Sequence, residues 1–270
     1  MTPAQPKVSV IVSTYNWPEA LELTIGSIGA QTRLPDEIVI ADDGSTDATR
    51  SLIARLQAAS AVPIRHIWHD DLGFRRTVIM NKAMAAATGD YLIQVDGDVV
   101  LSPHFVADHM ELAERGYFVC GSRVRLSEPM TRRMMERRQT TVSIVRLPPG
   151  YILNSLRSRV LRHFMALRYA KAIDHLRGCN MAFWKSDIVA VNGYDENLLE
   201  WGHEDGELAW RLHFAGVRKK ALKMGGNVYH LHHPEASRSN EHTHLRQLQA
   251  TISERRTWCP NGIDKHLKNV

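Results

Sequence analysis

The stretch GDYLIQVDGD, residues 89–98, carries the most informative motif of the chain, an apolar run that ends in two carboxylates. Residues 91–95 predict a short buried strand, and Asp96 and Asp98 follow it on either side of Gly97. Two carboxylates around a small residue at a strand end can bind one hard divalent cation, which then neutralises a diphosphate. An isolated Asp-x-Asp is often only an acidic turn. Here the buried strand that directly precedes the two aspartates makes metal binding the favoured interpretation.

Upstream of this motif, strands and helices alternate. Apolar runs predict strands at 8–13, 37–41 and 64–68, and helical patterns follow at about 17–31, 47–59 and 77–87. This alternation is typical of a mostly parallel sheet covered by helices on both faces, in which ligands bind at the carboxyl ends of the strands. Polar residues gather at those ends, at 13–16, 42–43, 69–71 and 96–98. We therefore expect an α/β fold with a ligand site at this edge of the sheet.

The length and composition are those of a globular protein. The chain has 270 residues, of which 44% are hydrophobic and 23% charged, and this excludes a disordered or fibrous chain. No apolar run approaches the ~18–20 residues of a membrane span, and the N-terminus lacks the pattern of a signal peptide. Three widely separated cysteines indicate reduced thiols rather than a disulfide framework. Together these features predict a cytoplasmic location.

A second acidic motif follows the strand at 37–41. In Asp42-Asp43-Gly44-Ser45 a carboxylate can accept the imide N–H of uracil, and the glycine lets the backbone approach a nucleoside. Thr14 and Tyr15 end the neighbouring strand and can pack on the same base. A simple turn followed by a helix cap is the alternative interpretation, and for this motif alone it is the stronger one.

Together these motifs resemble the family 2 glycosyltransferases of GT-A fold. The resemblance rests on residues 8–16, the Asp42-Asp43-Gly44-Ser45 turn and Asp96-Gly97-Asp98, and it extends to about residue 125. Such enzymes use a nucleotide sugar and a divalent metal, Mn²⁺ or Mg²⁺, and invert the anomeric centre. The resemblance implies that Asp98 binds the metal. It also implies a set of residues that bind the nucleotide sugar: Thr14, Tyr15, Asn16, Asp43, Asp96 and Gly97.

Residues 70–83 stand where the family places a helix close to the donor. An arginine there can neutralise diphosphate charge, and Arg75 and Arg76 are the candidates. The alternative is a basic helix start that faces solvent. The family pattern has Arg-Asn late in this helix, whereas this chain has Met80-Asn81.

The segment Trp201-Gly202-His203-Glu204-Asp205, with residues 178–183 and 193–196, resembles the acceptor half of galactosyltransferase-like and chondroitin-polymerase-like enzymes. This resemblance implies that Asp205 is the catalytic base and that Trp201, Gly202 and Glu204 hold the acceptor sugar. An inverting transfer needs one carboxylate on the face opposite the leaving group. Negative charge that complements a helix N-terminus is the alternative role for Glu204 and Asp205.

Histidines gather near the C-terminal end, at positions 230, 232, 233, 242 and 244. Imidazole together with carboxylate and phosphate oxygens suits Mn²⁺ or Mg²⁺, and histidine favours manganese. A zinc site is the alternative, but no cysteine accompanies the cluster. The resembling families have one metal-binding histidine after a strand here, which matches His230 best and His233 next.

Residues 123–177 hold 13 Lys and Arg against 3 Asp and Glu, a balance of +10, while the rest of the chain carries −5. Such asymmetry indicates an anionic partner. We expect a basic helix at 151–176 that meets an anionic membrane or a phosphorylated, lipid-linked acceptor. A solvated face, core packing and a dimer interface are alternatives. Nucleic acid is disfavoured, because no nucleic-acid motif or aromatic platform accompanies the charge.

These observations predict one GT-A domain with a nucleotide-sugar half (1–122), a basic insert (123–177), an acceptor half (178–258) and a tail (259–270). The expected enzyme is an inverting, metal-dependent glycosyltransferase that moves a sugar from a UDP-sugar to a glycan or lipid-linked acceptor. The resemblance points to bacterial surface polysaccharide or lipopolysaccharide synthesis, at the inner face of the cell membrane. A sugar-nucleotide nucleotidyltransferase and a non-catalytic module that binds anionic glycans are the alternatives.

Overall fold

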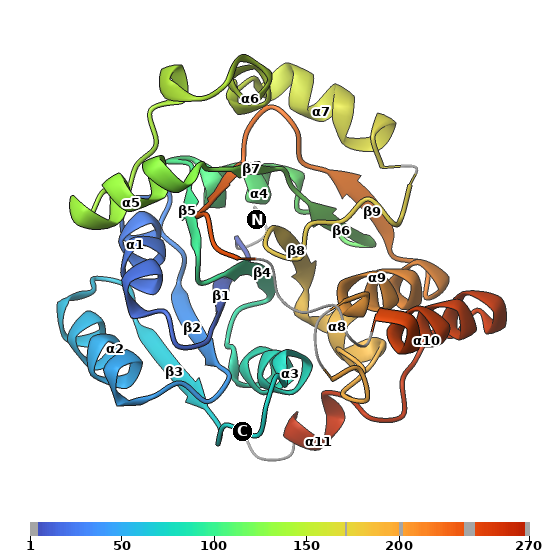
Figure 1. Cartoon of the computed structure of the whole chain (residues 1–270). Helices are drawn as coiled ribbons and strands as arrows, with labels where there is room; N and C mark the ends of the chain where they lie inside the picture. The colour runs from blue at the N-terminus through green and yellow to red at the C-terminus, as the bar shows by residue number, and fades with distance from the viewer. Residues whose placement is uncertain (1–4, 171, 200–201, 235–240, 268–270) are drawn as a thin grey trace.

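A seven-stranded sheet forms the centre of the protein in the computed structural model, which describes residues 5–170, 172–199, 202–234 and 241–267 (Figure 1). The first four strands in the sheet order run parallel, whereas β8 runs antiparallel to both β4 and β6. The expected mostly parallel α/β sheet is thus confirmed. The order of the strands is β3 (Ile64–Trp68), β2 (Glu37–Asp42), β1 (Val8–Thr14), β4 (Tyr91–Asp96), β8 (Met181–Trp184), β6 (Tyr117–Cys120) and β9 (Arg218–Ala221).

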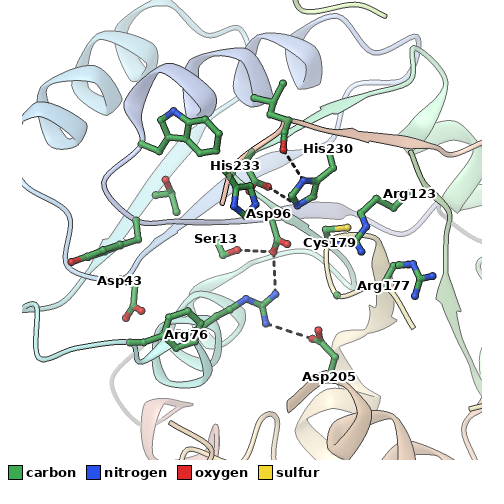
Figure 2. A pocket seen from close by; sticks show the side chains of 18 of the residues that line it. Ser13, Asp43, Arg76, Asp96, Arg123, Arg177, Cys179, Asp205, His230 and His233 are labelled. Carbon is green, nitrogen blue, oxygen red and sulfur yellow. Dashed lines mark hydrogen bonds and ion pairs between the residues drawn. The ribbon is translucent and has the colours of Figure 1, made fainter. Parts of the chain in front are cut away.

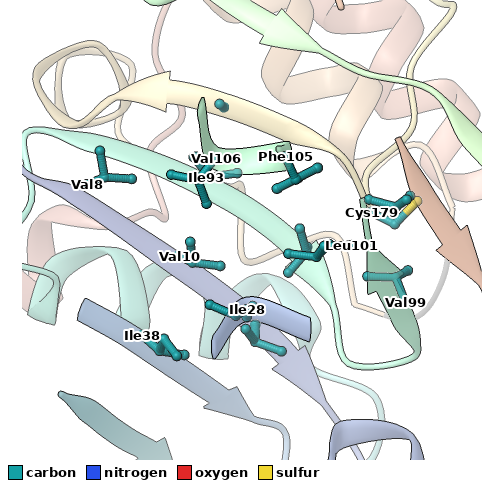
Figure 3. Close-up of a cluster of buried hydrophobic side chains, with 14 of the residues drawn as sticks. Val8, Val10, Ile28, Ile38, Ile93, Val99, Leu101, Phe105, Val106 and Cys179 are labelled. Atoms are coloured by element: carbon teal, nitrogen blue, oxygen red, sulfur yellow. The ribbon is translucent and has the colours of Figure 1, made fainter. Parts of the chain in front are cut away.

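Helices cover both faces of this sheet because alternate strand residues point to opposite sides. On one face, Val8, Val10 and Ile93 pack with Ile28 and other side chains of α1 (Pro18–Gly29), α2 (Asp47–Ala59) and α4 (Phe105–Leu112) (Figure 3). On the other face, Ile11 packs with α3 (Arg76–Ala86), α8 (Lys185–Ala190) and α9 (Glu204–Phe214). Burial on both faces explains why the central strands read as nearly continuous apolar runs.

A small second sheet brings the C-terminal histidines to the acidic motif. Strand β10 (Val228–His230) lies between β5 (Val99–Leu101), with which it is antiparallel, and β7 (Arg123–Arg125), with which it is parallel. The backbone N–H of Leu231 donates to the carbonyl of Asp98 at 2.9 Å. Segments more than a hundred residues apart in sequence therefore meet at one point.

The basic insert forms short helices, namely α5 (Glu128–Glu136), the 3-10 turn η1 (Ile144–Arg146), α6 (Pro149–Ser155) and α7 (Arg159–Arg168). The single helix expected over 151–176 is wrong. Leu156 takes an extended conformation at the end of α6, and the Ser158 hydroxyl caps α7 by accepting from the Leu161 N–H. A local side-chain cap and an extended residue interrupt a helical pattern that the apolar spacing alone would continue.

Helix α7 is attached to the body of the protein through Arg162. Its guanidinium is fully buried and lies 2.7 Å from the Asp108 carboxylate of α4. The opposite side of the helix exposes Val160 (80%), Phe164 (65%) and Leu167 (56%) to solvent. Core packing therefore does not account for these apolar residues.

The C-terminal part adds α10 (Glu241–Glu254), which packs on α9, and α11 (Asp264–Leu267), which packs on α3. Strand β9 forms the edge of the sheet beside β6 and is drawn in orange in Figure 1, where α10 lies beside α9 in red. Within the described ranges, no helix combines the length and the hydropathy that crossing a bilayer requires.

Candidate active site

A cavity of about 660 Å³ opens at the carboxyl ends of β1 and β4. Residues from both halves of the sequence line it, as expected from the strand-end rule for α/β sheets. Figure 2 shows Asp43 on one side, His230 and His233 on another, and Asp205 across from them. The polar side chains in its lining include Ser13, Thr14, Tyr15, Asp43, Arg76, Asp96, Asp98, Glu204, Asp205, His230, His232 and His233.

Asp98, His230 and His233 form a candidate metal centre. One ligand atom from each lies within 4.8 Å of the others. The Nε2 atom of His230 is 3.5 Å from Asp98 Oδ1, and that of His233 is 3.1 Å from Asp98 Oδ2. The Asp98 hydrogen bond raises the pKa of His233. Asp98 Oδ1 is buried and has no hydrogen-bond partner among the described residues, and a bound cation would satisfy this oxygen.

Backbone carbonyls fix the tautomers of both histidines. Nδ1 of His230 lies 2.9 Å from the Leu231 carbonyl, and Nδ1 of His233 lies 2.6 Å from the Pro234 carbonyl. A carbonyl oxygen can only accept, so each Nδ1 must carry the proton, and in a neutral ring the Nε2 lone pair then faces Asp98. Such outer hydrogen bonds orient metal-binding histidines in proteins. The donor set therefore fits a divalent cation.

Arg76, at the start of α3, connects the acidic motif of β4 with the acidic start of α9. Its largely buried guanidinium donates to Asp96 at 3.1 Å, to Glu204 at 3.4 Å and to Asp205 at 3.5 Å. Burial opposes the charge of Arg76, but Asp205 and Asp96 raise its pKa well above the ordinary value. This cation balances part of the negative charge gathered at the centre of the pocket.

Asp205 is held from one side. Its Oδ1 accepts from the Tyr194 hydroxyl at 2.6 Å, from Gln94 Nε2 at 3.3 Å and from Arg76. Its Oδ2 lies against the backbone of Gly178, where an added Cβ would come within 1.8 Å of that oxygen. Only glycine at position 178 leaves room for the carboxylate in this position.

Glu204 is more deeply buried than its neighbour Asp205. Its Oε2 accepts the Gly202 N–H at 2.9 Å, and its Oε1 accepts from Arg76. Burial, reinforced by the charge of Asp205, raises the pKa of Glu204 to about 6. The two adjacent carboxylates thus have different environments, which is common where carboxylates divide chemical roles.

Asp43 lies at the opposite side of the pocket. Its Oδ1 is 2.6 Å from His69 Nε2, and its Oδ2 accepts the Arg75 N–H at 2.9 Å. Each carboxylate oxygen can accept a second hydrogen bond, so Asp43 keeps capacity for a ligand. Thr14 and Tyr15 line the pocket beside it, and the Tyr15 hydroxyl donates to Asp71.

Three predicted site residues lie outside the pocket lining, and a fourth, Trp201, lies outside the described residues. Asn16 braces the loop after β1, since its N–H donates to Ser45 Oγ and its Oδ1 accepts the Thr46 N–H. The Arg75 guanidinium donates to the Asp70 carbonyl. Gly202 contacts Glu204 through its N–H. Gly97 lines the pocket, where its N–H donates to the Ser13 carbonyl.

Two neutral partners of Asp205, Tyr194 and Gln94, were not predicted as site residues. Gln94 is a polar residue in the middle of the buried strand β4, and a polar side chain within an apolar strand could have indicated a role in the site. Tyr194 gave no such signal, because a buried tyrosine is common in protein cores.

Comparison with known proteins identifies the family. The model of glycosyl transferase family 2 matches residues 9–188, and that of the N-terminal domain of galactosyltransferase matches residues 158–234. A validoxylamine A glucosyltransferase of Streptomyces hygroscopicus subsp. limoneus is 26% identical over 97% of this chain and 57% of its own length. An Escherichia coli chondroitin synthase is 24% identical over 84% of this chain and 35% of its own length.

A solved mannosyltransferase, PcManGT of Pyrobaculum calidifontis in complex with GDP-Man and Mn²⁺, shares the fold. It superposes with a TM-score of 0.60 at 20% identity, over 98% of this chain and 69% of its own. The expected GT-A fold is therefore confirmed. The chain spans 57% of the length of the validoxylamine A glucosyltransferase and 35% of that of the chondroitin synthase, less than two thirds in both cases. Because the family model covers most of its residues, the chain belongs to glycosyl transferase family 2.

Proposed function

We propose that the protein is an inverting, metal-dependent glycosyltransferase that moves a sugar from a UDP-sugar to a hydroxyl of a glycan or lipid-linked acceptor. The observation that carries the proposal is that Asp205 and the Asp98–His230–His233 cluster line one pocket. An inverting displacement needs a base for the incoming hydroxyl and positive charge beside the departing diphosphate. The pocket offers a candidate for each.

The donor nucleoside lies, in this proposal, between Asp43 and the end of β1. His69 and the Arg75 N–H hold the Asp43 carboxylate in place, and its spare lone pairs accept the uracil imide N–H. Thr14 and Tyr15 flank the uracil ring. Asp96 stands between this side and the metal centre, where it contacts ribose or metal, and Arg76 beside it offsets diphosphate charge.

Asp98, His230 and His233 hold the divalent cation in this proposal. When bound, such an ion neutralises the diphosphate as it departs. Two imidazoles beside one carboxylate favour Mn²⁺ over Mg²⁺. Support comes from the buried Asp98 oxygen, which has no hydrogen-bond partner in the part of the chain that the structure describes, and from the Mn²⁺ in the PcManGT structure.

Asp205 removes the proton from the acceptor hydroxyl. Its Oδ1 already accepts from Tyr194 and Gln94, so Oδ2, next to Gly178 in the pocket lining, receives the proton. Glu204, Gly202 and Trp201 hold the acceptor sugar as the family resemblance implies. In terms of the chain, we propose that residues 1–122 bind the nucleotide sugar and residues 178–258 the acceptor, with 123–177 as an insert and 259–270 as a tail.

The test is sugar transfer by Asp205→Asn, measured as UDP release over a panel of UDP-sugars. Loss of a positioned base should lower transfer by at least about 100-fold. UDP affinity, measured by calorimetry with Mn²⁺, should stay unchanged, because the base does not bind the donor. Asp47→Asn, on the exposed start of α2, is the matched control. Transfer near the wild-type rate would rule out Asp205 as the base.

The metal centre is tested separately by Asp98→Ala. This variant should lose the part of the UDP affinity that depends on Mn²⁺, since it removes the shared carboxylate of the cluster. Calorimetry with and without the ion measures that part directly. A Mn²⁺-dependent UDP affinity that survives the substitution would contradict the assignment.

We also propose that α6 and α7 contact an anionic membrane during synthesis of a surface polysaccharide or lipopolysaccharide. Val160, Phe164 and Leu167 form an exposed apolar stripe on α7, and the arginines at 159 and 168 flank it. Apolar side chains bordered by arginine suit the interface of an anionic bilayer. Sedimentation with phosphatidylglycerol vesicles should fall for Phe164→Ser/Leu167→Ser but not for the control Leu34→Ser. Equal sedimentation of all three proteins would refute this contact.

A further inference from the structure

We propose that Arg123 and Arg177 form a subsite for a negatively charged group of the acceptor, a phosphate or a carboxylate near the accepting hydroxyl. This inference rests on the proposed function, since it takes Asp205 as the base that the acceptor must reach. It names the class of acceptor that the proposed function leaves open.

Both arginines line the pocket, Arg123 from β7 and Arg177 from the segment that leads into β8. Arg177 directly precedes Gly178, whose backbone lies against the Asp205 carboxylate. Figure 2 shows Arg123 and Arg177 beside Cys179, on the side of the pocket away from Asp43. A group held there is close to the proposed base and remote from the nucleoside.

Arg76, Asp43 and Asp98, which also line the pocket, each have charged or ionisable partners: Arg76 has three carboxylates, Asp43 has His69, and Asp98 has two histidines. Arg123 and Arg177 form no ion pair with any carboxylate in the described ranges. Among the described residues, the Arg177 guanidinium donates to one group, the neighbouring Leu176 carbonyl.

A guanidinium presents several donors in a planar fork that matches carboxylate and phosphate oxygens, and it keeps its charge at any physiological pH. Two such groups at one end of a pocket favour an anion over a neutral glycan. Arg177 is exposed and Arg123 partly so, which leaves both guanidinium groups accessible to a ligand.

The donor diphosphate is the rival ligand, and the experiment separates the two. Binding of glucose 6-phosphate, glucuronic acid and glucose is measured by NMR in the presence of saturating UDP and Mn²⁺, so that the donor site is filled. At least one charged probe should bind about tenfold or more tightly than glucose, as expected for charge-assisted hydrogen bonds. A preference for one charged probe identifies the acceptor anion as a phosphate or a carboxylate.

Arg123→Gln and Arg177→Gln should each remove most of that preference, while UDP affinity stays within about twofold of wild type. Arg132→Gln is the matched control, because it removes the same charge from the exposed face of α5 in the same insert. Three results would each overturn the proposal: glucose binding as tightly as both charged probes, an equal loss in Arg132→Gln, or a parallel loss of UDP affinity. Asp205→Asn should keep the preference. If that variant still transfers sugar, the proposed base is wrong while the anion subsite stands.

Discussion

Replacing Glu204 with glutamine should make the protein more stable above pH 6 and leave it nearly unchanged near pH 4.5. In the wild type, burial and the nearby Asp205 charge raise the pKa of Glu204 from 4.5 to about 6. The folded protein therefore binds this proton more tightly than the unfolded chain. Unfolding releases the proton between these pH values, so the wild-type free energy of unfolding falls as pH rises through this window.

The size of the effect follows from the two pKa values. A separation from 4.5 to about 6 corresponds to about 2 kcal/mol. Glutamine has nearly the same shape and no charge, and Oε1 can still accept from either Gly202 or Arg76. Arg76 keeps two carboxylate partners, Asp96 and Asp205. We expect the variant to gain about 2 kcal/mol relative to wild type between pH 4.5 and pH 7.5.

The assay is urea denaturation of the ligand-free protein at pH 4.5, 6 and 7.5, followed by circular dichroism in the presence of EDTA. The quantity of interest is the difference in unfolding free energy between variant and wild type at each pH. Glu136→Gln, on the exposed side of α5, is the control and should show a constant difference, because water solvates this side chain in both states. A Glu204→Gln difference that stays constant, or becomes more unfavourable as pH rises, would refute the reasoning.

Three further substitutions test other contacts. Arg211→Met should lower the free energy of unfolding, measured by urea denaturation, by about 3–5 kcal/mol. The substitution leaves the Glu207 carboxylate, now 2.6 Å from the guanidinium, buried without its charged partner. A loss below about 1 kcal/mol would contradict this. Tyr91→Phe should leave the free energy of unfolding unchanged or raise it by up to about 1 kcal/mol, since the buried Tyr91 hydroxyl has no hydrogen-bond partner in the described part of the chain. A clear loss of stability in the same assay would contradict this. Gly178→Ala should lower transfer much more than UDP affinity, because its Cβ would displace Asp205; equal effects on both would show that the clash is relieved elsewhere.

The fold and the edge of the sheet that forms the pocket could be predicted from local patterns. Runs of β-branched residues predict buried strands such as β1 and β2, and the parallel arrangement brings their polar ends together. Asp43 and Asp96 were predicted as neighbours for this reason, and both line the cavity. The resemblance to family 2 glycosyltransferases rested on the same strand ends and is confirmed.

The partners of the site residues could not be predicted, because they depend on long-range packing. Nothing near Arg76 in sequence indicates that it bridges Asp96 to the start of α9, more than a hundred residues away. The break between α6 and α7 was also missed, since the apolar spacing runs on through Leu156. The roles assigned to individual site residues stay predictions until the variants described above are measured.

The pairing of β4 with β8 has a consequence for how this protein folds and how its insert can change. Tyr91 pairs with Trp184 across the whole of the basic insert, so the central sheet closes only after a long loop has been brought together. The entropy of closing a loop grows with the logarithm of its length, and doubling it costs only about 0.6 kcal/mol. The length of the insert can therefore change at little cost in loop-closure entropy. Folding rate is more sensitive than stability to such long-range pairing, so the insert should influence mainly how fast the sheet forms.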